Sequence, residues 1–204
     1  MHDAEPVLHP VKIADLRPTQ MTIGLREVTR KRHQWRERVE RDGADFLGRH
    51  MIPTVRGPKG RLWIIDAHHL SRALYDEGVE HVLAQVIADL SGLRDHLFRT
   101  YMDNRGWFHP FDDDGKRQPV KALPRHVRHL IDDPHRSLAG ELRRAGGYAK
   151  DTMPYSEFLW ADYLRGAIDR DAIEKDFEKA LGKALKLAHD GKAAYLPGWT
   201  GRQS

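Results

Sequence analysis

The segment Ile64–Leu74, "IIDAHHLSRAL", places one acid and two adjacent histidines where an apolar strand pattern changes to a helical one. A strand that runs into a helix leaves backbone N–H groups and the positive end of the helix dipole at the junction, and such an end binds anions. A histidine beside a bound phosphate can donate a hydrogen bond or transfer a proton near neutral pH. We therefore expect a phosphate or nucleotide site formed by Ala67, His68 and His69.

Asp66 has two interpretations at this junction. It could cap the helix, or its carboxylate could hold a magnesium ion or orient a nucleophile. Neighbouring helical residues point roughly 100 degrees apart, so His68 and His69 cannot easily bind one metal ion together. We expect one of the two histidines to face the junction and the other to pack.

Other residues could also bind an anion. Arg136-Ser137 opens a helical pattern after Asp132-Asp133-Pro134, although Ser137 or Asp133 could simply cap that helix. Lys150 follows Gly146-Gly147 and could close over a phosphate, although most such lysines are solvated.

The segment from Trp107 to Gly115 breaks all periodicity. The run Asp112–Asp114 could bind a divalent cation, but adjacent carboxylates before a glycine more often form a polar turn. Trp107, Phe108 and Phe111 could stack on a base, but aromatic residues in a polar loop usually fix the loop to the core.

The composition indicates a folded, globular protein. The chain has 204 residues, of which 40% are hydrophobic and 31% charged. The net charge of +4 permits a phosphate-bearing partner without requiring one. Basic residues crowd residues 26–38 and 125–150, where they could contact phosphate or form solvated helix faces.

Several classes are excluded or disfavoured. The chain has no cysteine, which rules out disulfides, thiolate metal sites and thiol nucleophiles. No run approaches the roughly 20 apolar residues of a membrane helix, and the first ten residues show no signal-peptide pattern. We expect a soluble, cytoplasmic protein without a membrane partner.

The N-terminal half shows mixed strand and helix patterns. We expect strands at Val7–Ile13 and Val82–Ala88, and a hairpin of Ile52–Val55 and Leu62–Ile65 around a Gly/Pro turn. Helical patterns cover Gly24–Asp42, the segment from Asp66 to Gly78, and Ser91–Arg105, whose apolar stripe is Leu93, Leu97, Phe98 and Tyr101.

Beyond Pro119 the apolar patterns are helical. The expected helices are Leu123–Ile131, Ser137–Arg144, Tyr155–Ile168 and Ala172–His189. The last has an amphipathic stripe that would pack on the core or on a partner subunit, so a homodimer is possible. The fold class is α/β (α+β), with a small mixed sheet in residues 1–118 and a helical extension in residues 119–204.

The Asp66-Ala-His-His69 junction resembles that of the ParB/sulfiredoxin superfamily, whose members carry Gly-Glu-Arg-Arg, Gly-Cys-His-Arg or Asp-Gly-His-His-Arg there. The resemblance extends upstream through Val11–Gln20. Downstream the sequence is similar to the ParB-like nuclease family. The segments that carry this similarity are Arg105-Gly-Trp107, Asp132–Gly140, Gly146-Gly-Tyr148 and Trp160-Ala-Asp162.

The resemblance implies a small α/β fold that binds nucleotide phosphates. Its members hydrolyse nucleotides, cut DNA, phosphorylate free serine or repair a sulfinic cysteine, so the implied ligand is a nucleotide of the ATP/ADP type, with Mg²⁺ as a possible cofactor. Activity does not follow from fold alone.

Three departures limit this comparison. Leu70 stands where the related kinases and sulfiredoxins have arginine, so Arg72 or Arg136 would have to replace that guanidinium. Sulfiredoxin chemistry is excluded because the cysteine is absent. In the serine kinases a glutamate acts as the base. The nearest counterparts in this chain are Gln20, which cannot accept a proton as a base, and Glu27.

Two function classes follow. The first is an enzyme of phosphoryl chemistry (nuclease, nucleotide hydrolase or small-molecule kinase) with Asp66, His68, His69 and Glu27 in the reaction and Arg136 assisting. The alternative is a non-catalytic, DNA-associated, partition-like module with a nucleotide switch. We find no helix-turn-helix with a basic recognition helix after residue 119, so the sequence gives little support to specific DNA readout.

Overall fold

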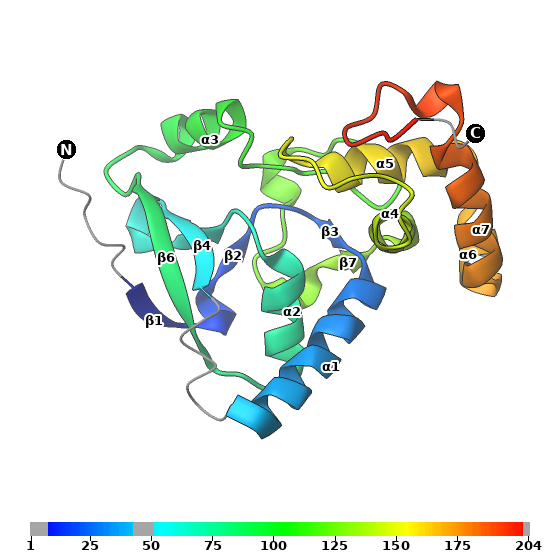
Figure 1. Ribbon diagram of the computed structural model, residues 1–204. Coiled ribbons are helices and arrows are strands. Elements are labelled where there is room, and N and C mark those ends of the chain that lie inside the picture. The colour runs from blue at the N-terminus through cyan, green and yellow to red at the C-terminus, as the bar shows by residue number, and fades with distance from the viewer. Residues whose placement is uncertain (1–7, 43–50, 202–204) are drawn as a thin grey trace. The chain divides into compact units, whose positions relative to one another are not determined.

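The computed structural model describes residues 8–42 and 51–201 and contains two compact units (Figure 1). Unit 1 comprises the described residues up to Thr22 together with Val28–Ile131, and unit 2 comprises Ile23–Glu27 and the chain from Asp132 onward. Apart from the short segment Ile23–Glu27, the units therefore divide at Ile131–Asp132. The domain boundary expected near residue 118 would separate two parts that fold independently. The division into compact units does not test this, so the boundary stays a prediction.

Unit 1 is built on a five-stranded mixed sheet with strand order β1-β6-β4-β5-β2. The pairs β1–β6 and β4–β5 are antiparallel, and the pairs β4–β6 and β2–β5 are parallel. The strands are β1 (Leu8–Lys12), β2 (Arg17–Pro18), β4 (Met51–Arg56), β5 (Leu62–Ile64) and β6 (His81–Asp89). The short strands β3 (Thr22–Ile23) and β7 (Ile131–Asp132) form a separate pair.

The helices α1 (Leu25–Asp42), α2 (His68–Asp76) and α3 (Asp95–Asn104) alternate with these strands along the chain. Short 3-10 turns connect them: η1 (Ile13–Asp15), η3 (Pro58–Gly60), η4 (Val120–Ala122) and η5 (Val127–His129). The expected first strand, the β4–β5 hairpin, the strand β6 and the helices α1 and α2 are confirmed. α2 follows β5 directly, so the Asp66–His69 segment lies at a strand-to-helix junction as expected.

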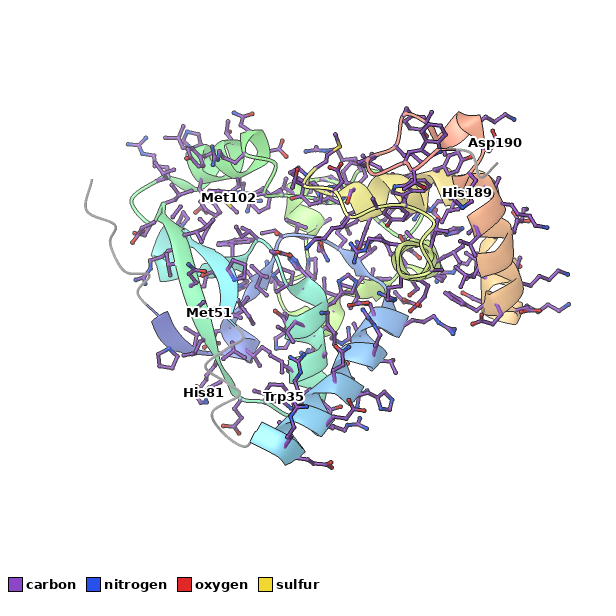
Figure 2. All side chains as sticks on the ribbon, viewed as in Figure 1. Trp35, Met51, His81, Met102, His189 and Asp190 are labelled. Atoms are coloured by element: carbon purple, nitrogen blue, oxygen red, sulfur yellow. The ribbon has the colours of Figure 1, made fainter. Side chains whose placement is uncertain are left out.

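One face of the unit 1 sheet packs against α3. Val55 and Trp63 are paired across β4 and β5, and they cluster with Phe98, Met102 and Phe108. Met102, labelled in Figure 2, is fully buried. Because side chains alternate along a strand, the neighbouring Ile64, also fully buried, points to the opposite face.

Two expectations for unit 1 were wrong. The helix α3 starts at Asp95 and buries Phe98 and Met102, whereas Leu97 and Tyr101 are 48% and 41% exposed. The helix expected at 123–131 does not form. Pro124 disfavours helical geometry at the preceding residue, and Leu123 is extended, with φ −53° and ψ 136°.

Unit 2 is largely helical and has its own core. Its helices are α4 (Pro134–Arg144), α5 (Ser156–Arg165), α6 (Arg170–Lys175) and α7 (Phe177–Ala188), followed by the turn η6 (Gly191–Ala193). Leu138, Leu142, Trp160 and Leu164 are fully buried, and the Trp160 indole donates a hydrogen bond to the Pro197 carbonyl (2.8 Å). The Tyr148 ring stacks on Trp160 with a 4.3 Å centroid separation.

The long helix expected at 172–189 is interrupted at Asp176. This residue has φ −152° and ψ 88°, and its carboxylate accepts a hydrogen bond from the Lys179 amide (3.0 Å), so it caps α7. Aspartate is a favoured N-cap residue, but the apolar periodicity did not reveal the break because it continues from α6 into α7. Within the part of the chain that is described, no helix is long and apolar enough to span a bilayer.

Candidate functional site

The junction between β5 and α2 has an unusual backbone. The N-cap residue of α2 is Ala67, which adopts a left-handed conformation with φ 65° and ψ 27°. Such a conformation costs an L-residue about 1–2 kcal/mol, and strained backbone of this kind is often found at functional sites. The Ala67 carbonyl starts the helix by accepting from the Ser71 amide (2.8 Å) and the Ser71 hydroxyl (3.0 Å).

Asp66 is exposed and does not cap α2. Its Oδ1 accepts a hydrogen bond from the next amide, that of Ala67, at 2.6 Å. The capping interpretation of Asp66 is therefore wrong, because Ala67 occupies the N-cap position and its methyl group cannot accept a hydrogen bond. The Asp66 carboxylate lies one residue before the helix and stays accessible to solvent.

His68 is held inside unit 1. It is 5% exposed, and its Nε2 accepts a hydrogen bond from the Thr19 amide at 3.1 Å. The Thr19 hydroxyl in turn donates to the Ile64 carbonyl (2.6 Å). Because a backbone amide can only donate, Nε2 must be the unprotonated nitrogen, and a neutral ring then carries its proton on Nδ1. His68 therefore joins α2 to the chain that follows β2.

His69 is the more accessible histidine of the pair, since its side chain is only partly buried. Arg72, the expected substitute for the missing arginine, is already engaged. Its Nε donates to Asp76 (3.0 Å) and its Nη1 to the Leu130 carbonyl (3.0 Å), which ties α2 to the segment after η5. These bonds would have to be given up for Arg72 to reach a phosphate at the start of the helix.

The other candidate residues belong to unit 2. Glu27 forms an ion pair with Arg144 of α4 at 2.8 Å, and the same arginine is paired with Glu141. Ser137 is 4% exposed, and its Oγ accepts from the Arg26 amide at 3.3 Å. In this structure Glu27 and Ser137 thus connect α4 to the first turn of α1.

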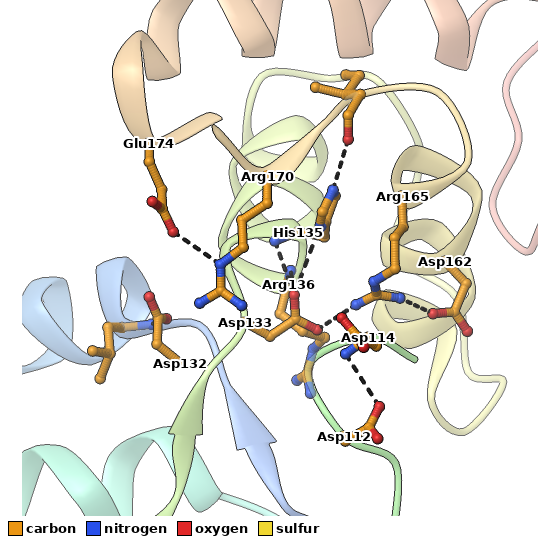
Figure 3. Close-up of polar contacts among 12 residues, drawn as sticks. Asp112, Asp114, Asp132, Asp133, His135, Arg136, Asp162, Arg165, Arg170 and Glu174 are labelled. Atoms are coloured by element: carbon orange, nitrogen blue, oxygen red, sulfur yellow. Dashed lines mark hydrogen bonds and ion pairs between the residues drawn. The ribbon is translucent and has the colours of Figure 1, made fainter. Parts of the chain in front are cut away.

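The start of α4 is a buried polar cluster (Figure 3). Asp133 is 1% exposed; its Oδ1 accepts from the amides of His135 (3.0 Å) and Arg136 (3.3 Å), and its Oδ2 pairs with Arg165 at 2.6 Å. His135 Nε2 lies 2.8 Å from the Ile168 carbonyl oxygen. The expected alternative, that Asp133 caps this helix, is confirmed.

Arg136 is buried rather than exposed to solvent. Its side chain is 5% exposed, and its guanidinium carbon lies 3.4 Å from the centroid of the Phe158 ring. Burial lowers its pKa, because leaving water disfavours the charged form, although Glu157 and Asp133 partly oppose this effect. A ligand could reach this guanidinium only if the surrounding side chains moved.

Burial also changes the carboxyl groups around α4. It raises the pKa of Asp162 despite the ion pair with Arg165, and it raises the pKa of Asp132 despite the hydrogen bond from the Leu25 amide (2.8 Å). Asp132 and Ser137 together satisfy the first amides of α1, those of Leu25 and Arg26.

Gly146 and Gly147 terminate α4 in an ordered cap. Gly146 has φ 83°, and the Gly147 amide donates to the Leu142 carbonyl (2.9 Å). A β-carbon at Gly147 would lie 2.3 Å from Leu142 Cδ1. The glycines are therefore used for a tight helix end, and Lys150 follows this cap on the exposed surface.

The Asp112–Asp114 run forms a turn. Asp112 accepts hydrogen bonds from Lys116 N (2.8 Å), Asp114 N (3.1 Å) and Gln118 Nε2 (2.6 Å). Burial alone would raise the pKa of Asp112, but these bonds outweigh it and lower the pKa. Phe108 is 4% exposed in the core of unit 1, so this aromatic residue fixes the loop.

Metal binding can be judged from the donor groups. In residues 8–42 and 51–201 no group of three or more histidine and acidic side chains is arranged to hold an ion. Asp66 could supply one oxygen, and Mg²⁺ is often bound by one or two carboxylates plus substrate phosphates. The junction therefore fits a metal that arrives with a phosphate ligand better than a closed protein site.

The residue missed most clearly from the sequence is Thr19. It lies 49 residues before His68, and nothing in the sequence indicated that its amide would pair with that ring. The partnership of Asp133 with Arg165 was missed for the same reason. Both contacts depend on how distant segments pack.

Taken together, unit 1 has an α/β fold with a candidate anion site at a strand-to-helix junction. Residues 9–166 match the family model described as "Putative ParB-like nuclease". Because this match covers more than half of the sequence, the chain belongs to the ParB-like nuclease family.

The solved structures that match the chain include the following two. The crystal structure of protein Atu1540 from Agrobacterium tumefaciens shares 49% identity, with a TM-score of 0.91 over 98% of this chain and 99% of that one. The C-terminally truncated chromosome-partitioning protein ParB from Caulobacter crescentus, complexed with CTP-gamma-S, shares 12% identity over 91% of this chain and 93% of that one. Its TM-score of 0.30 is too low to support an argument. No curated protein matches the sequence.

Proposed function

We propose that this protein binds a phosphate group of a nucleotide or a nucleic acid at the N-terminal end of α2, and that it catalyses phosphoryl chemistry there. The observation that supports this most is the left-handed Ala67 at the β5–α2 junction, with exposed Asp66 on one side and accessible His69 on the other. The helix N-terminus attracts an anion, and no acidic or hydroxyl side chain occupies the N-cap position.

The roles of the junction residues differ. The amide end of α2 would hold the phosphate oxygens, and His69 would donate a hydrogen bond to them or transfer a proton at a ring nitrogen. Asp66 would orient a water or hydroxyl nucleophile with its exposed carboxylate, and Mg²⁺, if it is used, would share that carboxylate with the substrate. His68 would act as a positioning residue through its bond to Thr19.

The reaction that fits these groups is hydrolysis of a phosphoester or phosphoanhydride, which also agrees with the family description. Transfer to a small alcohol would need a base near the acceptor. Glu27 was the candidate for that base, but it is paired with Arg144, so we give this kinase-like reaction lower weight.

A binding-only module is the second candidate. It is favoured by one observation: Arg72 and Glu27 are held in internal bonds, and Arg136 is buried against Phe158. In that case the α2 site would bind a nucleotide as a switch for association with DNA.

Turnover distinguishes the two candidates. Purified protein would be incubated with nucleoside triphosphates and with plasmid DNA in magnesium, and phosphate release and strand cleavage would be followed. We expect Asp66→Asn and His69→Ala to lower the rate at least tenfold. Asparagine keeps the oxygen that accepts from the Ala67 amide, so the first variant tests the charge rather than the fold.

Nucleotide binding without turnover in the wild type would favour the switch. Full activity in both variants would show that the reaction occurs elsewhere. Circular dichroism of each variant would confirm that it is folded.

A further inference from the structure

Unit 1 contains a cluster of arginines around the edge strand β2 and the turn η5. Its members are Arg17, Arg61, Arg125 and Arg128, and we refer to them as the arginine cluster. They come from the edge strand β2, from the residue before β5, and from the segment that ends in η5. None of them forms an ion pair with a carboxylate within residues 8–42 and 51–201.

The sheet explains why the first two meet. Arg17 pairs with Trp63 in the parallel β2–β5 ladder, and Arg61 lies two residues before Trp63. Arg61 lies just before β5 and is also extended (φ −70°, ψ 136°), so its side chain falls on the same face as that of Trp63, and its charge acts on Arg17. β2 is an edge strand, so one side of this pair is not covered by another strand.

The segment around η5 adds the other two arginines. His126 Nδ1 accepts from the Arg128 amide (3.0 Å), and the Arg128 Nε donates to His129 Nε2 (3.0 Å). The His126 ring also packs edge-on against Tyr75 of α2, with a 4.8 Å centroid separation. Arg125, Arg128 and His129 are exposed.

Electrostatics supports the proximity of these groups. Burial, and then the charges of Arg61 and Arg125, lower the pKa of Arg17, while Asp15 opposes them. Burial, then Arg128, His129 and Arg17, lower the pKa of His126. The charge of Arg17 therefore lies near those of Arg61 and Arg125, and the His126 ring lies near both Arg17 and Arg128 in the same region.

Several arginines outside the cluster are paired with carboxylates. Arg32 and Arg36 pair with Glu77, Arg143 pairs with Glu157, and Arg165 pairs with two aspartates. A folded protein gains no stability from unneutralised like charges, but an external anion would relieve the repulsion.

We propose that the arginine cluster is a binding surface for the phosphate backbone of a nucleic acid. Several guanidinium groups on separate segments require a ligand with several anionic groups, and a nucleic acid strand carries a regular series of phosphates. Arginine is also suited to this ligand, because its planar group can bind a phosphate through two hydrogen bonds. This surface does not depend on whether the α2 junction is catalytic.

The test is the salt dependence of binding to a fluorescent oligonucleotide of mixed sequence, measured by anisotropy as single strand and as duplex. Arg61→Gln, Arg125→Gln and Arg128→Gln would be combined, because all three side chains are exposed. Each lost contact with duplex phosphate lowers the slope of log K against log salt by about 0.9. We expect the triple variant to lose about two to three in slope and at least tenfold in affinity.

The matched control is Arg94→Gln, Arg99→Gln and Lys186→Gln, which removes the same charge from exposed positions outside the cluster. The proposal predicts that the control keeps most of the affinity. It is overturned if the wild type does not bind at low salt, or if the two triple variants bind equally well. It is also overturned if vesicles with anionic lipid bind in place of the oligonucleotide.

Discussion

Two adjacent histidines at the start of α2 have different environments. His68 is buried and accepts a hydrogen bond from the Thr19 amide, whereas His69 is partly exposed at the same helix end. The sequence suggested that one histidine works and the other packs, and burial indicates which is which. The assignment of His69 to the phosphate stays a prediction.

Removing the two histidines one at a time should separate these roles. His68→Ala leaves the buried Thr19 amide without its acceptor, which should lower the free energy of unfolding by about 1–3 kcal/mol. His69→Ala should change stability by less than about 0.5 kcal/mol. Urea denaturation of both variants measures the difference. A larger loss of stability for His69→Ala would contradict the assignment.

Glu77 provides a test of pH dependence at the level of one residue. The hydrogen bond from Arg36, assisted by Arg32 and opposed by burial, lowers the pKa of Glu77 from 4.5 to about 2. A lowered pKa means that Glu77 stabilises the folded state above pH 4.5 and that this stabilisation is lost as the pH falls toward 2.

Glu77→Gln should therefore flatten the stability profile in this acidic window. Because Arg32 and Arg36 are substantially exposed, the stabilisation at neutral pH should be no more than about 1 kcal/mol. Thermal unfolding between pH 2.5 and 6 in low salt measures it. An unchanged pH profile in the variant would show that the ion pairs contribute nothing.

At the scale of elements, the α2 junction could be predicted because its signals are local. The apolar run, the acid and the new helical period are adjacent in sequence, and their order fixes the β5–α2 connection. The helix expected at 123–131 failed because Pro124 prevents helical geometry at Leu123. The break at Asp176 was missed because its apolar stripe continues on both sides.

The roles of buried polar residues could not be predicted from the sequence. Arg136 was expected to bind phosphate, yet it stacks on Phe158, and Glu27 pairs with an arginine 117 residues away. Both contacts form only when distant helices pack, so neither the residue types nor the spacing reveal them.

Gly24, the residue just before α1, tests how closely the start of α1 packs against α4. A β-carbon at Gly24 would lie 2.8 Å from both the Ser137 amide nitrogen and its Oγ. Gly24→Ala should therefore destabilise the protein by about 1–3 kcal/mol, because one of the two segments must shift. Chemical denaturation followed by circular dichroism measures the change.

Gly182 is the matched control for this substitution. It lies inside α7, and a β-carbon there meets no atom within 4 Å. Gly182→Ala should stabilise the protein by about 0.5–1 kcal/mol through helix propensity. If the two variants had equal stability, the close approach of Gly24 to Ser137 would be wrong.

At the scale of the whole molecule, the net charge of +4 is modest, but its distribution is informative. Basic residues 26–38 and 125–150 were expected either to contact phosphate or to form solvated faces. In the structure Arg32, Arg36, Arg143 and Arg144 are paired with glutamates, whereas Arg125 and Arg128 join the arginine cluster. Sequence composition alone could not make this distinction.

Calorimetric titration with nucleotides, with and without magnesium, tests most directly whether the α2 junction binds phosphate. Wild-type protein should bind at least one nucleotide, and His69→Ala should weaken that binding at least tenfold. His96→Ala, which changes an exposed histidine of α3, should bind like the wild type. Failure of every nucleotide to bind the wild type, or equal binding by His69→Ala, would contradict the phosphate site.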